Sequence, residues 1–186
     1  MKYKYFMVSL PRTGTTSITK MMEICGLEGK HCPFTYFEHY LNNDRYDFYS
    51  DTPVYIPSVV EKLCKRDDVK FIYVERPYDK IFESWVNYGL FRTFHQMIIE
   101  KDNGVISDGR LFDFNSYYES FSNTILTSDN YSEVFESHKE KVISIIKKHD
   151  KELLIYNFND GWKPFCDFLG VEIPNEEIPK LNYSNK

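Results

Sequence analysis

Residues 9–17 (SLPRTGTTS) concentrate groups that bind anions. They have the spacing of a Walker A phosphate loop, with Ser9 and Gly14 at the two glycine positions and Thr15 where a lysine is expected. The cation is instead Arg12, inside the loop. An ordinary strand-to-helix turn is the alternative, but amides at a helix N-terminus favour negative charge. We therefore expect anion binding by Arg12, Gly14, the backbone amides of residues 13–17, and the hydroxyls of Thr13, Thr15, Thr16 and Ser17.

A second cation stands at the end of the apolar segment 70–75 (KFIYVE), where Arg76 is followed eight residues later by Ser84. A guanidinium at a strand end can chelate a phosphate, and a hydroxyl from the next helix can add a donor. Taken alone, Arg76 would be read as a surface ion pair and Ser84 as a solvent-facing helix residue. Together with the loop at 9–17, they favour a phosphate site.

Three residues are candidates for a general base: Asp51, His31 and His39. Histidine has a pKa near the working pH, but both histidines fall in the irregular stretch 27–45. Asp51 follows an expected strand at 46–50 and should emerge on the same rim as the loop. It could equally assist Thr52 as the N-cap of a helix beginning at Pro53, and these two roles stay open.

The elements that position these residues alternate along the chain. Strands are expected at 5–10, 46–50, 70–75 and 152–157, and helices are marked by apolar residues at helical spacing around 18–25, 53–63, 81–88, 142–149 and 162–169. Such alternation predicts an α/β fold, a P-loop-type parallel sheet of about four to five strands covered by helices on both faces. We expect one domain over residues 1–186, with residues 86–131 as a cover that lines an acceptor site.

The two motifs together resemble the PAPS-dependent sulfotransferases, where PAPS is 3′-phosphoadenosine 5′-phosphosulfate. PRTGTT after a short N-terminal strand is similar to their 5′-phosphosulfate loop, with Arg12 where cytosolic members usually have lysine. Small P-loop sulfotransferase-like proteins usually have arginine there. Residues 70–85 resemble the 3′-phosphate motif, with Arg76 and Ser84 in the two binding positions. The family's C-terminal Arg-Lys-Gly segment is not evident.

The resemblance implies an enzyme that moves a sulfuryl group from PAPS to a hydroxyl or amine of a small-molecule or glycan acceptor. It would release 3′,5′-ADP without a metal, with Arg12 acting on the leaving oxygens. Residues 153–169 resemble the family's C-terminal strand and helix, so Phe158 would lie near the adenine, although core packing explains that ring equally well. His138 and Asp51-Thr52-Pro53 stand where the small relatives tend to have the same residues.

Composition limits the other possibilities. A net charge of −5 argues against a nucleic-acid or membrane-surface binder, and the four cysteines lack zinc-site spacing, so reduced thiols and a cytoplasmic location are expected. A P-loop nucleotide or nucleoside kinase would need the missing lysine, although Asp51 could serve its Mg²⁺. A catalytically degenerate nucleotide-binding module is the third possibility, supported by the change to Arg12.

Overall fold

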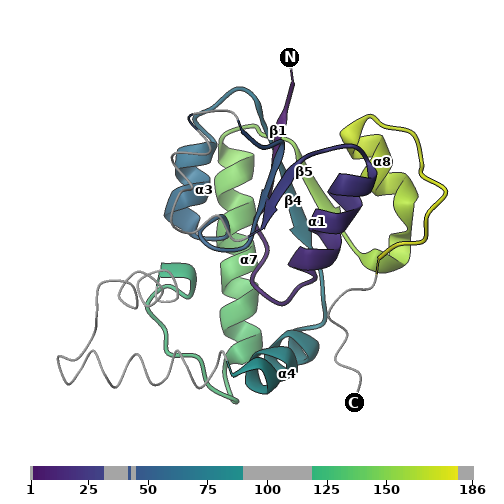
Figure 1. The fold of residues 1–186 in the computed structure, drawn as a ribbon. Coiled ribbons are helices and arrows are strands. Elements are labelled where there is room, and N and C mark those ends of the chain that lie inside the picture. The colour runs from purple at the N-terminus through teal and green to yellow at the C-terminus, as the bar shows by residue number, and fades with distance from the viewer. Residues whose placement is uncertain (1, 32–41, 43–44, 90–118, 180–186) are drawn as a thin grey trace.

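A computed structural model describes residues 2–31, 42, 45–89 and 119–179. At its centre is a parallel sheet of five strands in the order β2-β3-β1-β4-β5 (Figure 1). The expectation of an α/β fold with about four to five parallel strands is confirmed. The strands are β1 (Lys4–Met7), β2 (Gly29–His31), β3 (Phe48–Ser50), β4 (Val69–Val74) and β5 (Leu153–Tyr156).

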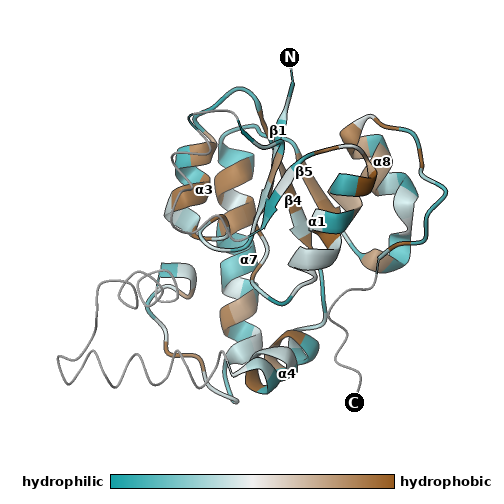
Figure 2. Ribbon diagram, in the orientation of Figure 1, coloured by the Kyte–Doolittle hydropathy of each residue, from teal (hydrophilic) through white to brown (hydrophobic). Residues whose placement is uncertain are grey.

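Helices cover both faces of this sheet, as expected. One face carries α1 (Thr15–Ile24) and α8 (Trp162–Leu169), and the other carries α3 (Pro57–Leu63) and α7 (Tyr131–Lys148) (Figure 1). Helix α4 (Tyr78–Tyr88) follows β4 and packs against α7 near the carboxyl ends of the strands. In Figure 2 both α3 and α7 carry bands of hydrophobic and of hydrophilic residues, as expected for helices packed on one side only.

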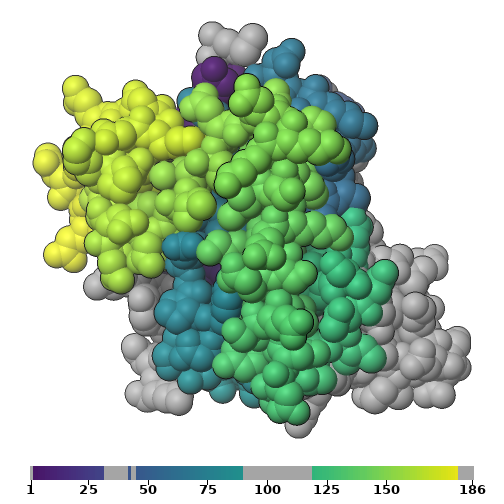
Figure 3. Space-filling model, turned by 180° about the vertical axis from the view of Figure 1, so that it is seen from behind, coloured from purple at the N-terminus to yellow at the C-terminus, as the bar shows by residue number. Residues whose placement is uncertain are grey.

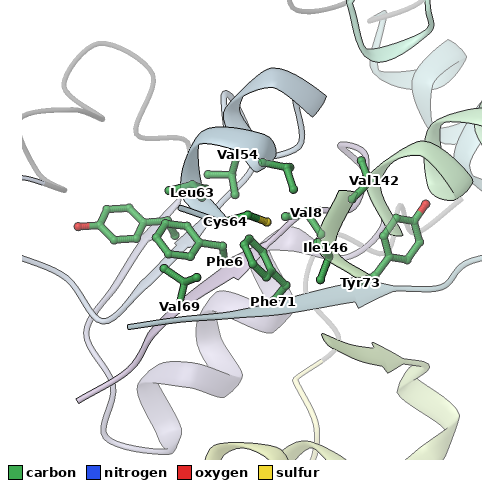
Figure 4. Packing of buried hydrophobic residues seen from close by; sticks show 12 residues of the cluster. Phe6, Val8, Val54, Leu63, Cys64, Val69, Phe71, Tyr73, Val142 and Ile146 are labelled. Atoms are coloured by element: carbon green, nitrogen blue, oxygen red, sulfur yellow. The ribbon is translucent and has the colours of Figure 1, made fainter. Parts of the chain in front are cut away.

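The two cores follow from the alternation of side chains along each strand. Phe6 and Phe71 point toward α3 and α7 and belong to the cluster shown in Figure 4. Their neighbours Met7 and Ile72 point to the opposite face, toward α1 and α8. All four side chains are fully buried, so the sheet holds the strand ends rigidly in place.

Two expectations about local structure are wrong. Residues 29–31 form the edge strand β2, although the stretch 27–45 was expected to be irregular. The helix after β3 begins at Pro57 with Ile56 as N-cap, whereas Thr52 and Pro53 lie in a turn joined by a cis peptide bond. The turn forms because the Asp51 carbonyl accepts a hydrogen bond from the Val54 amide at 2.7 Å, so no helix begins at Pro53 for Asp51 to cap.

The expected cover region, residues 86–131, lies partly outside the described residues because 90–118 are not among them. Its described part contributes Phe121 and Leu126 to a buried cluster with Trp85 and Phe135. This segment therefore packs as part of the core between α4 and α7.

Candidate active site

The loop that joins β1 to α1 has an alternating backbone conformation. Arg12 has φ 70° and Gly14, the N-cap of α1, has φ 103°. Such left-handed residues turn successive backbone amides toward one side and build anion-binding concavities. Gly14 has no side chain to cap the helix, so the positive end of the α1 dipole is not covered by a cap.

Two buried hydrogen bonds fix this loop to the neighbouring elements. The Ser9 hydroxyl accepts from the Val74 amide at 2.6 Å, which ties the start of the loop to the end of β4. The Trp85 indole donates to the Pro11 carbonyl at 2.9 Å, which ties its middle to α4. Both anchors are fully or almost fully buried, so the loop is held from two sides.

The structure brings the two expected phosphate motifs into direct contact. The Nε of Arg12 donates to the Ser84 hydroxyl at 3.0 Å, and the guanidinium of Arg76 donates to the Arg12 carbonyl. Arg12, Arg76 and Ser84 therefore form one cluster. Within the described part of the chain, neither Nη group of Arg12 donates a hydrogen bond, so both can donate to an anion.

Tyr88 ends the helix expected around 81–88, and no role in the site was expected of it. Tyr88 is 67% exposed, and the guanidinium carbon of Arg12 lies 4.5 Å from the centre of its ring. That distance is within the range of a cation–π contact. The signal was present in the spacing, because Ser84 and Tyr88 are four residues apart and share one face of α4.

The four hydroxyl residues of the loop differ in burial and in their contacts. Thr13 donates to the Leu10 carbonyl at 2.7 Å and Thr15 donates to the Asp51 carboxylate at 3.4 Å, and both residues are buried. Thr16 and Ser17 lie in the first turn of α1, Thr16 half-buried and Ser17 buried. Ligand binding by the four hydroxyls stays a prediction, and those of Thr13 and Thr15 already donate to protein acceptors.

Phe158 lies in the short helix η1 (Phe158–Asp160) and is half-buried against the core on the α1 side. Its ring faces the phosphate loop so closely that a Cβ added at Gly14 would lie 2.5 Å from Phe158 Cε2. The ring also makes an edge contact with Tyr156, with 5.6 Å between the ring centroids. Phe158 thus packs against the core and also borders the loop, and its place near the adenine stays a prediction.

Two of the three candidate bases lie beside the same loop. Asp51 Oδ2 is 3.8 Å from His31 Nε2, and its other oxygen, Oδ1, accepts from the Thr52 amide at 2.7 Å. Asp51 itself has φ 68°, a left-handed conformation that is uncommon for residues other than glycine and is often found at functional sites. The third candidate, His39, lies outside the described residues.

A cavity of about 340 Å³ opens next to the cluster of Arg12, Arg76 and Ser84, at the carboxyl end of β4. Its walls come from the end of β4, from α4 and α7, and from Asn157 after β5, and they include Glu75, Arg76, Tyr78 and Lys139. Lys139 Nζ lies 2.7 Å from Glu75 Oε1 in this cavity. The Tyr78 hydroxyl donates to the Glu136 carboxylate, and burial together with that carboxylate raises the pKa of Tyr78. A larger hollow of about 600 Å³ lies along α7, the helix in the centre of Figure 3, but contains no loop residue. We assign the smaller cavity to the site because it includes Arg76.

Comparison with known proteins identifies the family. A family model described as the sulfotransferase domain matches residues 36–186, so the chain belongs to the sulfotransferase domain family. The matched range begins after the loop at 9–17, so the assignment does not depend on that loop.

A curated relative, Ava biosynthesis cluster protein M of Aspergillus versicolor, is 27% identical over 151 residues. The similarity covers 73% of this chain and 54% of the relative, so the chain spans about half of the relative's length.

Neither a metal-binding group nor a membrane-spanning helix is present among the described residues. No three His, Cys, Asp or Glu side chains in the described ranges are grouped so that they could hold a metal ion. In the same part of the chain, no helix has both the length and the apolar character needed to cross a membrane.

Proposed function

We propose that this protein transfers a sulfuryl group from PAPS to a hydroxyl or amine of a small-molecule or glycan acceptor. The observation that carries this proposal is the guanidinium of Arg12, held by Ser84 and Tyr88 beside the N-terminus of α1 with both Nη groups available. Family membership supports sulfuryl transfer. The name of the relative refers to a biosynthesis cluster, which supports a small-molecule acceptor.

The donor set fits a phosphosulfate. Arg12 and Arg76 supply two guanidinium groups, and the first turn of α1 supplies backbone amides aimed out of the helix end. Arg76 would take the 3′-phosphate, with Ser84 sharing its hydroxyl between that phosphate and Arg12. Phe158 would lie near the adenine, because its ring borders the loop at Gly14.

Sulfuryl transfer is an in-line displacement in which catalysis consists mainly of positioning and charge stabilisation. The acceptor oxygen forms a bond to sulfur as the bond from sulfur to the 5′-phosphate oxygen breaks, and that phosphate leaves with the electron pair. Arg12 would stabilise the charge that develops on the leaving oxygens. The Asp51–His31 pair would take the acceptor proton at the other end of the reaction.

Nucleotide selectivity tests the proposal directly. Isothermal calorimetry should show 3′,5′-ADP binding more tightly than 5′-ADP by roughly 10-fold to 100-fold, because a charge-assisted contact contributes about 1.5–3 kcal/mol. Arg76→Ala should abolish this preference. Arg66→Ala is the matched control, since Arg66 pairs with Asp68 on the side of the sheet away from the loop. Equal affinity of the wild type for both nucleotides would contradict the assignment of Arg76.

Turnover separates this proposal from the kinase alternative. With PAPS and a small phenol as acceptor, sulfuryl transfer should persist in EDTA. A strict requirement for Mg²⁺ with ATP as donor would favour the kinase instead. Tight nucleotide binding without turnover on any acceptor would favour a catalytically degenerate module.

A further inference from the structure

A chain of side-chain contacts connects α1 to the edge of the sheet. The Thr19 hydroxyl lies 2.9 Å from the Thr15 carbonyl and 3.1 Å from the Ser50 hydroxyl. The Ser50 hydroxyl in turn lies 3.1 Å from His31 Nδ1. Ser50 and His31 are register partners in neighbouring parallel strands, so the backbone fixes their proximity.

The direction of each hydrogen bond in this chain follows from counting protons. A carbonyl oxygen can only accept, so the single hydroxyl proton of Thr19 goes to the Thr15 carbonyl. Thr19 must then accept from Ser50, which uses the single proton of the Ser50 hydroxyl. Ser50 has no proton left to donate to His31, so His31 Nδ1 must be the donor in the third contact.

This count determines the tautomer of His31. With the proton on Nδ1, the neutral imidazole has its lone pair on Nε2, the nitrogen 3.8 Å from Asp51 Oδ2. The same Asp51 oxygen accepts from Thr15, the first residue of α1. The basic nitrogen of His31 therefore faces the rim that carries the phosphate loop.

We propose that Thr19 and Ser50 are positioning residues that hold His31 in the Nδ1–H tautomer, so that Nε2 is the atom that accepts the acceptor's proton. The proposal rests on the proposed sulfuryl transfer. In the step, the acceptor O–H bond breaks, its proton moves to Nε2, and the acceptor oxygen bonds to sulfur as the 5′-phosphate leaves. The resulting imidazolium lies beside the Asp51 carboxylate, which stabilises its charge.

Burial of Thr19 and Ser50 supports the assigned directions of these hydrogen bonds. Ser50 is completely buried and Thr19 is 8% exposed, so both hydroxyls have little contact with solvent. The His31 side chain is 37% exposed and can be reached by an acceptor from solvent. The hydrogen-bond chain thus connects the Thr15 carbonyl, inside the protein, to the imidazole of His31, which is partly exposed.

The tautomer can be measured independently of activity by ¹⁵N NMR of the histidine side chains. At a pH where the imidazole is neutral, the wild type should show a protonated-type Nδ1 and an unprotonated-type Nε2 for His31. A His31→Gln variant, which lacks these signals, assigns them. A predominant Nε2–H tautomer in the wild type would overturn the proposal.

Thr19→Val provides the sharpest test because it removes a hydroxyl that never touches His31. Valine keeps the shape of threonine, and the Thr19 methyl already packs beside Gly29. Without the Thr19 oxygen, Ser50 is free to donate to Nδ1, and the Nε2–H form gains the Asp51 carboxylate as an acceptor. We expect the ¹⁵N signals to shift toward the Nε2–H tautomer. Thr19→Ser, which keeps the hydroxyl, should retain the wild-type pattern. Unchanged ¹⁵N signals in Thr19→Val would refute the proposal that Thr19 fixes the His31 tautomer.

Activity with PAPS and a small phenol completes the test. Thr19→Val should lower kcat by at least about 10-fold with little change in KM for PAPS, and Thr19→Ser should restore it. If the tautomer shifts while kcat is unchanged, Nε2 is not the proton acceptor and the proposal fails. Failure of the proposed function has a different signature, because a protein that neither binds nor turns over PAPS would still show the tautomer shift in Thr19→Val.

Discussion

His138 makes the stability of this fold sensitive to acid. It lies on α7 and is 1% exposed, and its Nε2 is 2.9 Å from the carbonyl of Tyr55, four residues after Asp51. The carbonyl can only accept, so Nε2 carries the proton of the neutral ring. No described residue accepts a hydrogen bond from Nδ1, the atom that a second proton would occupy. Protonation would therefore create a buried cation with one unsatisfied donor.

The size of the effect follows from the shift in pKa. Burial lowers the pKa of His138 from 6.5 to about 4, so between these values the unfolded chain binds a proton that the folded chain does not. Stability from this group is complete above pH 6.5, falls as the pH decreases through this window, and levels off below pH 4. The full difference is roughly 3 kcal/mol, of which about 2 kcal/mol should be lost by pH 5.

Urea unfolding followed by circular dichroism at several pH values between 7 and 4.5 measures this loss. In His138→Gln, which has no titratable group but can still donate to the Tyr55 carbonyl, the decrease in unfolding free energy should be smaller by about 2 kcal/mol at pH 5. The comparison uses the slope with pH, so a lower stability of the variant at pH 7 does not affect it.

His149→Gln is the matched control, because His149 caps the same helix but lies at the surface, 2.8 Å from Glu61. Most of the wild-type pH dependence should remain in that variant, since surface ion pairs contribute little. Parallel pH profiles of the wild type and His138→Gln would show that His138 does not couple stability to acid.

The remaining predictions concern the site. Gly14→Ala should destabilise the loop and weaken 3′,5′-ADP binding, measured by calorimetry, because the new Cβ meets the Phe158 ring at a left-handed φ. Arg12→Ala should lose about 100-fold in kcat with little change in KM, whereas Arg12→Lys should retain much of it; a change in KM alone would assign Arg12 to ground-state binding. Tyr88→Leu should lower kcat several-fold and Tyr88→Phe should not, since only the ring faces Arg12. Asp51→Asn should reduce kcat by about 100-fold with the melting temperature preserved, and full activity would exclude a direct role.

Strands with an apolar run were predicted from the sequence, and a strand without one was missed. Strand β4 was expected at 70–75 and runs from Val69 to Val74, because its apolar run is buried on both faces. Strand β2 consists of Gly29, Lys30 and His31 at the edge of the sheet, partly exposed and without an apolar pattern. Its pairing with β3 comes from tertiary contacts that no local pattern encodes.

The start of α3 shows why the expected N-cap, Thr52, was wrong. Both Pro53 and Pro57 could occupy the first position of a helix. Pro57 does so, because the Val54 and Ile56 amides are used in turns closed by the Asp51 and Pro53 carbonyls. The prediction of a helix beginning at Pro53 was therefore wrong by four residues, because local turn hydrogen bonds precede Pro57.

Parallel register explains how residues far apart in sequence reach one rim. Met7 pairs with Ser50, and Ser50 pairs with His31, so β1, β3 and β2 are aligned at these three residues. The segments that follow β1 and β3 therefore begin at the same edge of the sheet. This places the Asp51 carboxylate next to the side chains of Thr15 and His31. A slip of one residue in β2 would turn the His31 side chain to the other face of the sheet and break its contact with Ser50. The chain of hydrogen bonds from Thr19 to His31 thus depends on the register of the edge strand β2.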